Sequence, residues 1–181
     1  MKPINEDQAI RSLSKRRNEF RRTIARGYEP AAQSCMTCTT PGACCLDAHF
    51  VNVHISRLEA VEIRRIIEEM PVEIRVQVKQ RINESIERYG LNDSGDTFSQ
   101  TFACPLYDKQ VGCLVHATAK PLPCIHHACY EKKEDLPPEE LLAAEEQAVE
   151  RLNMRTYRNL QPWLPIPVAI RRVLQQQRPE K

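Results

Sequence analysis

The sequence predicts a mainly α-helical protein whose helices pack around an irregular, cysteine-rich metal-binding core, with at most one short pair of strands. Several long stretches carry apolar residues at helical spacing, and all eight cysteines fall into two groups. The chain has 181 residues but only one Trp, five Tyr and four Phe. A chain of this length can bury about 70% of its unfolded surface. Because few large side chains are available to fill a core, a metal or disulfide cross-link would help to hold the fold.

The first predicted helix covers residues 5–26 and stops at Gly27. Its incomplete apolar stripe consists of Ala9, Ile10, Leu13, Phe20 and Ile24. Its other faces are expected to carry Arg11, Lys15, Arg16, Arg17, Arg21, Arg22 and Arg26. With eight Lys/Arg and three Asp/Glu, residues 1–26 have a charge of +5, although the whole chain has only +2. We interpret this segment as a solvated helix packed by one side. The alternative is a contact between residues 11–26 and a nucleic acid or another anionic partner.

A short strand and a capped helix are predicted next. Apolar residues alternate along residues 51–55, which is typical of a strand. Ser56 and Glu59 have the spacing of a capping box, in which each side chain accepts a hydrogen bond from the backbone N–H of the other residue. The helix that follows is expected to run to about Met70. Its predicted buried face consists of Leu58, Val61, Ile66 and Ile67.

A third helix is expected between Pro71, a suitable first residue, and Gly90, a suitable stop. Its apolar positions are Ile74, Val78, Ile82, Ile86 and Tyr89. Residues 104–129 show no lasting period of either kind. Two further helices are expected at about 138–159 and 168–177, separated by prolines.

The predicted domain organisation has three parts. Residues 1–30 form a basic N-terminal helix. Residues 31–135 form a cysteine-cluster metal-binding domain with an inserted helical pair at 56–90. Residues 136–181 supply C-terminal helices that pack on this domain.

The cysteines are the strongest chemical signal in the chain. The early group is Cys35, Cys38, Cys44 and Cys45, and the late group is Cys104, Cys113, Cys124 and Cys129. No apolar leader resembles a signal peptide, and no apolar run approaches the ~20 residues of a membrane span. A cytoplasmic location is therefore expected. Disulfides are rare in that compartment, so the clustered cysteines favour metal ligation.

The spacing within the early group is that of a metal site. Cys35 and Cys38 form a Cys-x-x-Cys pair, which lets two thiolates converge on one ion while turn amides donate to the sulfurs. Cys44 and Cys45 are adjacent, and in extended chain their side chains would project to opposite sides. The pair can therefore serve two centres, or one cysteine can bind while the other packs.

The cofactor expected from these thiols is zinc or iron. Eight thiolates suffice for two tetrahedral zinc sites, or for one iron–sulfur cluster and one zinc. Early and late cysteines that share a centre would join the two halves of the chain. His126 and His127 lie between two late cysteines, either as ligands or as hydrogen-bond donors to ligands. Ordinary structural roles are expected for His49, His54 and His116.

The early cysteines resemble the opening of the zinc- or iron-chelating cysteine-cluster proteins of the YkgJ type, which begins Cys-x-x-Cys-x-x-Cys-Cys. Cys35, Cys38, Cys44 and Cys45 match it, with five residues rather than two before the final pair. Three downstream family motifs are Cys-Pro-x-Leu, Cys-x-Ile-Tyr and Arg-Pro-x-x-Cys-Arg. Their approximate counterparts are Cys104-Pro105-Leu106, Cys113-Leu114-Val115-His116 and Lys120-Pro121-Leu122-Pro123-Cys124-Ile125.

The resemblance covers about residues 35–129. The interval from Cys113 to Cys124 is one residue longer than the family pattern. The chain also departs from that pattern at Val115, His116, Lys120 and Ile125, so it resembles a divergent member. The resemblance implies metal or iron–sulfur chelation and supplies no established reaction.

Three functions follow from the sequence. The first is a metal-binding protein whose centre is structural or handles the metal itself. The second is an iron–sulfur redox protein or a methylase-like enzyme, since the family is distantly similar to an iron–sulfur methylase acting on flagellin lysines. The radical-enzyme spacing Cys-x3-Cys-x2-Cys is absent, as are a glycine-rich loop and His-Glu-x-x-His. The third is a zinc-stabilised module that contacts nucleic acid or protein. The sequence leaves enzymatic activity undecided.

Overall fold

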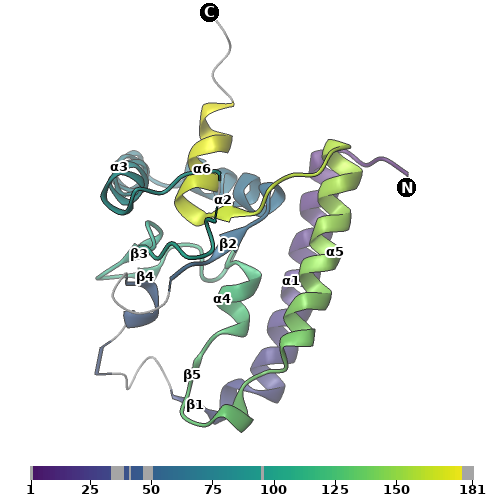
Figure 1. Ribbon diagram of the computed structural model, residues 1–181, viewed down its shortest axis with the longest axis vertical. Coiled ribbons are helices and arrows are strands. Elements are labelled where there is room, and N and C mark those ends of the chain that lie inside the picture. The colour runs from purple at the N-terminus through teal and green to yellow at the C-terminus, as the bar shows by residue number, and fades with distance from the viewer. Residues whose placement is uncertain (1, 34–38, 41, 47–50, 95, 177–181) are drawn as a thin grey trace, which may run out of the picture. The chain divides into compact units, whose positions relative to one another are not determined.

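The computed structural model describes residues 2–33, 39–40, 42–46, 51–94 and 96–176. Of these described residues 59% are helical, and they form six α-helices and short antiparallel strand pairs, which confirms the predicted fold class (Figure 1). Three such pairs are present among the described residues, each two residues long, where at most one was expected. No helix in the described ranges is long and apolar enough to cross a membrane.

The chain divides into two compact units, and each is built from two separate stretches of sequence. The first unit comprises Met1–Pro41 and Lys120–Gln161, and the second comprises Gly42–Ala119 and Pro162–Lys181. The second unit also contains the predicted helical pair. Each unit is described by itself below.

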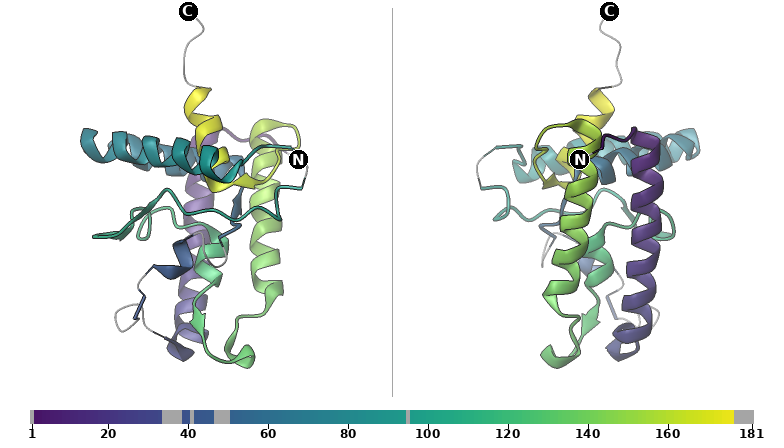
Figure 2. Two further views of the ribbon diagram at one scale, coloured as in Figure 1. Left: turned by 60° about the vertical axis from the view of Figure 1, so that its left-hand side comes forward. Right: turned by 90° about the vertical axis from the view of Figure 1, so that its right-hand side faces the viewer.

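Two long antiparallel helices form the frame of the first unit, α1 (Glu6–Gly27) and α5 (Glu139–Tyr157), which lie side by side in both orientations of Figure 2. Arg16 of α1 forms an ion pair with Glu145 of α5, with Nη2 and Oε2 2.9 Å apart. The hydroxyl of Tyr157, at the end of α5, donates to Glu6 at the start of α1. These contacts fix the antiparallel register.

The sequence of α1 explains both its start and its buried face. Asn5 caps the helix, because its Oδ1 accepts from the N–H of Gln8 at 2.8 Å and the Gln8 side chain accepts from the N–H of Asn5 at 3.2 Å. The buried residues are Ala9, Leu13, Arg17, Phe20 and Ile24. The expectation that every basic residue lies outside the buried face is wrong for Arg17, whose exposed fraction is 1%. Arg17 shares the helical face of Leu13 and Phe20, and its aliphatic stem packs there.

Shorter elements complete the first unit. They are η1 (Glu29–Ala31), β1 (Ala32–Gln33), α4 (Leu122–His126), β5 (Cys129–Tyr130) and η3 (Lys133–Asp135). Strands β1 and β5 pair antiparallel, and α4 contacts both α1 and α5. The sequence did not predict α4, because a five-residue helix is too short to show a period.

The second unit is organised around α2 (Arg57–Glu69), which contacts α3 (Val72–Tyr89) and α6 (Ile166–Gln175). The predicted capping box is confirmed: the N–H of Glu59 donates to Ser56 Oγ at 3.3 Å, and the N–H of Ser56 donates to Glu59 Oε2 at 3.0 Å. Helix α6 begins two residues earlier than expected. A proline is tolerated in its first turn, where no intrahelical partner exists for a backbone N–H.

Short strands and one turn complete the second unit. They are η2 (Ala43–Cys45), β2 (His54–Ile55), β3 (Tyr107–Asp108), β4 (Gly112–Cys113) and β6 (Leu164–Pro165). The strand predicted at residues 51–55 is thus only two residues long, and it pairs antiparallel with β6. Strands β3 and β4 form a hairpin, which carries Cys113.

Candidate metal centre

The adjacent pair Cys44 and Cys45 lies in the 3-10 turn η2 of the second unit. The turn is closed by the N–H of Cys45, which donates to the carbonyl of Gly42 at 2.8 Å. The pair is therefore not in extended chain, and the expectation that the two side chains project to opposite sides does not apply. In a 3-10 helix successive residues are about 120° apart. Cys44 is exposed and Cys45 is half-buried.

A backbone hydrogen bond joins the early and the late cysteines within the second unit. The N–H of Cys104 donates to the carbonyl of Cys45 at 2.9 Å. Helix α3 holds the same loop, because Ser85 Oγ donates to the carbonyl of Ala103 at 3.0 Å and Arg81 Nε to that of Pro105 at 3.0 Å. Cys104 is therefore anchored on both sides of its position in the chain.

Cys104 opens a tight turn that directs backbone donors at its own sulfur. The N–H of Tyr107 donates to the carbonyl of Cys104 at 3.1 Å, and the N–H groups of Leu106 and Tyr107 also interact with the Cys104 sulfur. Such donors stabilise a thiolate, and they are the usual outer shell of a metal-bound cysteine. The sequence signal for them is Pro105, which favours a turn directly after the cysteine.

Burial dominates the electrostatics of this thiol. Burial raises the pKa of Cys104 to about 12, and the nearby Cys113 thiol also raises it, whereas the Leu106 and Tyr107 amides and the Arg81 charge act in the opposite direction. A thiol in such surroundings is protonated at neutral pH. A bound metal cation supplies the charge that removes the proton from a coordinating thiol.

Cys113 reaches the same region through the β3–β4 hairpin. It lies opposite Tyr107 in the strand register, and its carbonyl accepts from the N–H of His116 at 3.0 Å. The hairpin loop is held by Asp108, whose Oδ1 accepts from the N–H groups of Gln110 and Val111 at 2.8 and 3.2 Å. These two hydrogen bonds lower the pKa of Asp108, and the one from Gln110 has the larger effect.

The late cysteines of the first unit are Cys124, in α4, and Cys129, in β5. Cys129 lies opposite Gln33 in the β1–β5 register, which brings it next to the chain that leads into the early group. Cys35 and Cys38, the two early cysteines numbered within this unit, lie outside the described residues.

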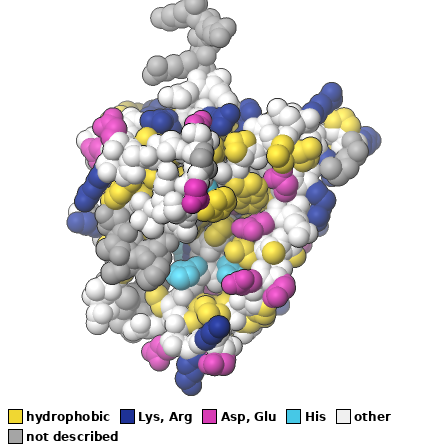
Figure 3. Space-filling model, viewed as in Figure 1, with side chains coloured by type: hydrophobic (Ala, Val, Ile, Leu, Met, Phe, Trp, Pro, Cys, Tyr) yellow, Lys and Arg dark blue, Asp and Glu magenta, His cyan; other side chains and the backbone are white. Residues whose placement is uncertain are grey.

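The two histidines beside Cys124 differ in their surroundings. His126 Nε2 is 3.2 Å from the carbonyl oxygen of Pro138, and its ring stacks parallel to Phe20 with centroids 6.4 Å apart. Burial of part of the ring, followed by the charges of His126 and Lys120, lowers the pKa of His127. A neutral imidazole is the form that ligates metal. Histidine side chains reach the surface on the face drawn in Figure 3.

The remaining histidines have other surroundings. Both ring nitrogens of His54 are engaged, Nδ1 with the carbonyl of Asn52 at 2.6 Å and Nε2 with Thr97 Oγ1 at 2.9 Å. This matches the structural role expected for His54. His116 is exposed, and His49 lies outside the described residues.

Within the described ranges, no three His, Cys, Asp or Glu side chains are arranged so that they could hold a metal ion. The structure brings Cys45, Cys104 and Cys113 into one region of the second unit, and it places Cys124 and Cys129 in the first. The expectation that the early and late groups share one centre stays a prediction, because two predicted ligands are not described. Comparison with protein-family models, curated proteins and solved structures found no match.

Proposed function

We propose that this chain is a metal-binding protein that holds zinc or iron through cysteine thiolates. The observation that carries the proposal is the Cys104 sulfur, which belongs to a half-buried residue of the second unit and is faced by the backbone N–H groups of Leu106 and Tyr107. These donors favour the thiolate, whereas burial opposes it, and a bound cation resolves the conflict.

The chemistry of the donors favours a soft or borderline metal. Thiolates select zinc or iron–sulfur clusters, whereas magnesium and calcium prefer oxygen ligands. Cys45 and Cys104 meet through backbone hydrogen bonding, and Cys113 acts electrostatically on Cys104. Sulfur is therefore the ligand atom that this region of the second unit offers.

We further propose one centre in each unit. By residue number the cysteines divide four and four: Cys44, Cys45, Cys104 and Cys113 in the second unit, Cys35, Cys38, Cys124 and Cys129 in the first. Each set contains early and late cysteines, so each centre would join the two separate stretches from which its unit is built. Four thiolates are the ligand number of a structural zinc site. The four cysteines of the second unit are all described and are not arranged to hold an ion in this structure, so metal binding would have to draw their sulfurs together.

The test is the metal content of protein purified anaerobically, measured by elemental analysis. We expect about two zinc ions per chain, or iron with visible absorption that dithionite bleaches. Cys104→Ser should lose about half of the metal, and Cys129→Ser should lose the other half. The control is Ala119→Ser, which places the same hydroxyl at a buried position of the second unit and should keep all of the metal.

Metal-free protein that melts at the same temperature as the purified protein would contradict the proposal. Full metal content in both cysteine variants would contradict it as well. Complete metal loss in either single variant would show one shared centre in place of two, and would refute the assignment of one centre to each unit.

A further inference from the structure

Four basic residues form a row along one exposed face of α1. Arg11, Lys15, Arg22 and Arg26 are all exposed. An α-helix turns by about 100° per residue. The positions of all four residues therefore lie within about 60° of one another around the helix axis. The row extends along 15 residues, or about 22 Å. We call these four residues the basic row.

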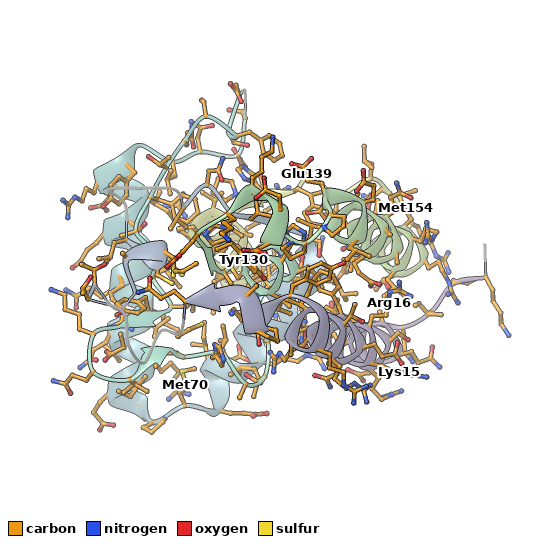
Figure 4. The ribbon with its side chains drawn as sticks, turned by 90° about the horizontal axis from the view of Figure 1, so that it is seen from below. Lys15, Arg16, Met70, Tyr130, Glu139 and Met154 are labelled. Carbon is orange, nitrogen blue, oxygen red and sulfur yellow. The ribbon has the colours of Figure 1, made fainter. Side chains whose placement is uncertain are left out.

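The basic row lies opposite the buried face of the helix. Leu13, Phe20 and Ile24 lie about 180° away around the axis and pack in the first unit. In Figure 4 the labelled Lys15 points outward from α1, whereas Arg16 lies on the side facing α5. The fold thus separates the basic residues of α1 into an outer row and an inner group that includes Arg16 and Arg17.

The outer charges are not neutralised by the described part of the protein. None of the four residues in the basic row forms an ion pair with a described residue. Arg22 Nε donates to the carbonyl of Asn18 at 3.2 Å, a contact within the helix that leaves the charge uncompensated. Of the acidic residues of α1, Asp7 lies at one end of the row and Glu19 at its edge.

From this arrangement we infer that the basic row binds the phosphate backbone of a nucleic acid. Lys and Arg side chains neutralise the phosphates of a nucleic acid, and such contacts carry no sequence information. A membrane-surface helix would need large apolar residues beside its charges, and a stable protein interface would need an apolar or aromatic centre. Among the described residues, the exposed large hydrophobic side chains all lie outside α1: Leu46, Val72, Val76, Phe98, Val111, Leu136 and Leu160.

The test uses the full chain with its metal, and a labelled 20-base-pair DNA duplex of mixed sequence followed by fluorescence anisotropy. If the protein contacts four phosphates, a plot of the logarithm of the association constant against the logarithm of the salt concentration should have a slope of about −3.6. Raising the salt from 50 to 200 mM should then lower the affinity about a hundredfold. Changing all four residues of the basic row to Gln should weaken binding at 50 mM salt by at least about fiftyfold and flatten the slope. An unrelated duplex sequence should bind equally well.

The control variant changes four exposed cations elsewhere, Lys79, Lys109, Lys132 and Arg151, to Gln. It has the same net charge as the row variant and should retain most of the affinity, whereas equal losses would refute a defined site. Arg16→Gln should bind like the parent protein, because Arg16 is paired with Glu145.

Two further results would overturn the inference. One is parent protein that binds neither duplex DNA nor single-stranded RNA at 50 mM salt. The other is protein that binds phosphatidylserine vesicles or an acidic peptide through the basic row but not nucleic acid. Circular dichroism and unchanged metal content confirm that each variant is folded.

Discussion

Gly42 holds the turn before Cys44 and Cys45 in a conformation that favours glycine. Its φ is +80°, in the left-handed region. A Cβ atom added there would overlap the ring of Tyr107, which closes over the glycine. Because Tyr107 also pairs with Cys113 across the hairpin, this contact ties the early cysteine turn to the late cysteines of the second unit.

Replacing Gly42 should therefore destabilise the protein. Gly42→Ala combines a left-handed backbone, which costs about 1–2 kcal/mol, with overpacking against Tyr107, which costs about 1–3 kcal/mol. We expect the free energy of unfolding to fall by about 2–5 kcal/mol in urea titrations. Gly27→Ala is the control, because a Cβ there meets nothing within 4 Å and alanine favours a helix. Equal stability of the two variants would contradict this view of the turn.

His54 should make stability depend on pH. Burial lowers the pKa of His54, against the opposing effects of Asn52, the Asp96 charge and Thr97. The unfolded chain therefore binds the proton more tightly than the folded chain does. The stability due to neutral His54 is complete above the unfolded pKa of about 6.5 and is lost as the pH falls through the lower, folded pKa.

The measurement is urea unfolding at pH 7.5, 6.5 and 5.5. The free energy of unfolding should fall toward pH 5.5 in the parent protein, and should fall less in His54→Gln, which does not titrate in this range. Parallel pH profiles for the two proteins would show that His54 contributes nothing to the dependence.

At the scale of elements, α1 and α2 both begin with a capping box, but only the box of α2 is buried. Ser56 and Glu59 are 2% and 1% exposed, whereas Asn5 is exposed to solvent. Loss of an N-cap costs about 1 kcal/mol. Ser56→Ala also removes a hydroxyl that donates to Glu59 Oε2 at 3.0 Å, and a buried carboxylate is costly to leave without that donor.

We therefore expect Ser56→Ala to lower the free energy of unfolding by about 2–3 kcal/mol and Asn5→Ala by about 1 kcal/mol. Thermal and urea unfolding of the two variants provide the comparison. Equal losses would show that burial of the cap in α2 adds nothing.

The long helices could be predicted from the sequence because their signals are local. Apolar periodicity and the Ser56–Glu59 box lie within each segment, and the predicted ends fall within about two residues of those of α1, α2 and α5. The strands depend on distant partners. His54 pairs with Pro165, 111 positions away, and no local pattern indicates such a pairing.

At the scale of the whole molecule, the cysteines could be recognised as a chemical group but not assigned to places in the fold. Spacing and composition single out all eight, but each unit combines stretches far apart in sequence. That division depends on packing, for example of Phe20 and Val149 in the first unit. The backbone donors at Cys104 belong to the amides of Leu106 and Tyr107, and the sequence shows only Pro105 as a sign of the turn.

Metal removal should loosen the cysteine-bearing segments before the long helices. Helices α1 and α5 bury apolar residues of their own, such as Leu13 and Leu152, and α2 buries Ile63. The segments 104–119 and 122–130 have only two-residue strands and the five-residue helix α4 between irregular turns. If a metal replaces regular packing there, chelation under reducing conditions should raise amide exchange in these segments by at least about tenfold and leave α2 nearly unchanged.

Hydrogen-exchange mass spectrometry of metal-loaded and chelated protein measures this difference, and metal restored to the chelated protein should reverse it. Cys104→Ser should reproduce the loosening at 104–119 alone, because its centre belongs to the second unit. Equal acceleration in α1, α2 and α5 would mean that the metal holds the entire fold. Unchanged exchange at 104–119 after complete metal loss would mean that the hairpin and its hydrogen bonds to α3 suffice to order this segment.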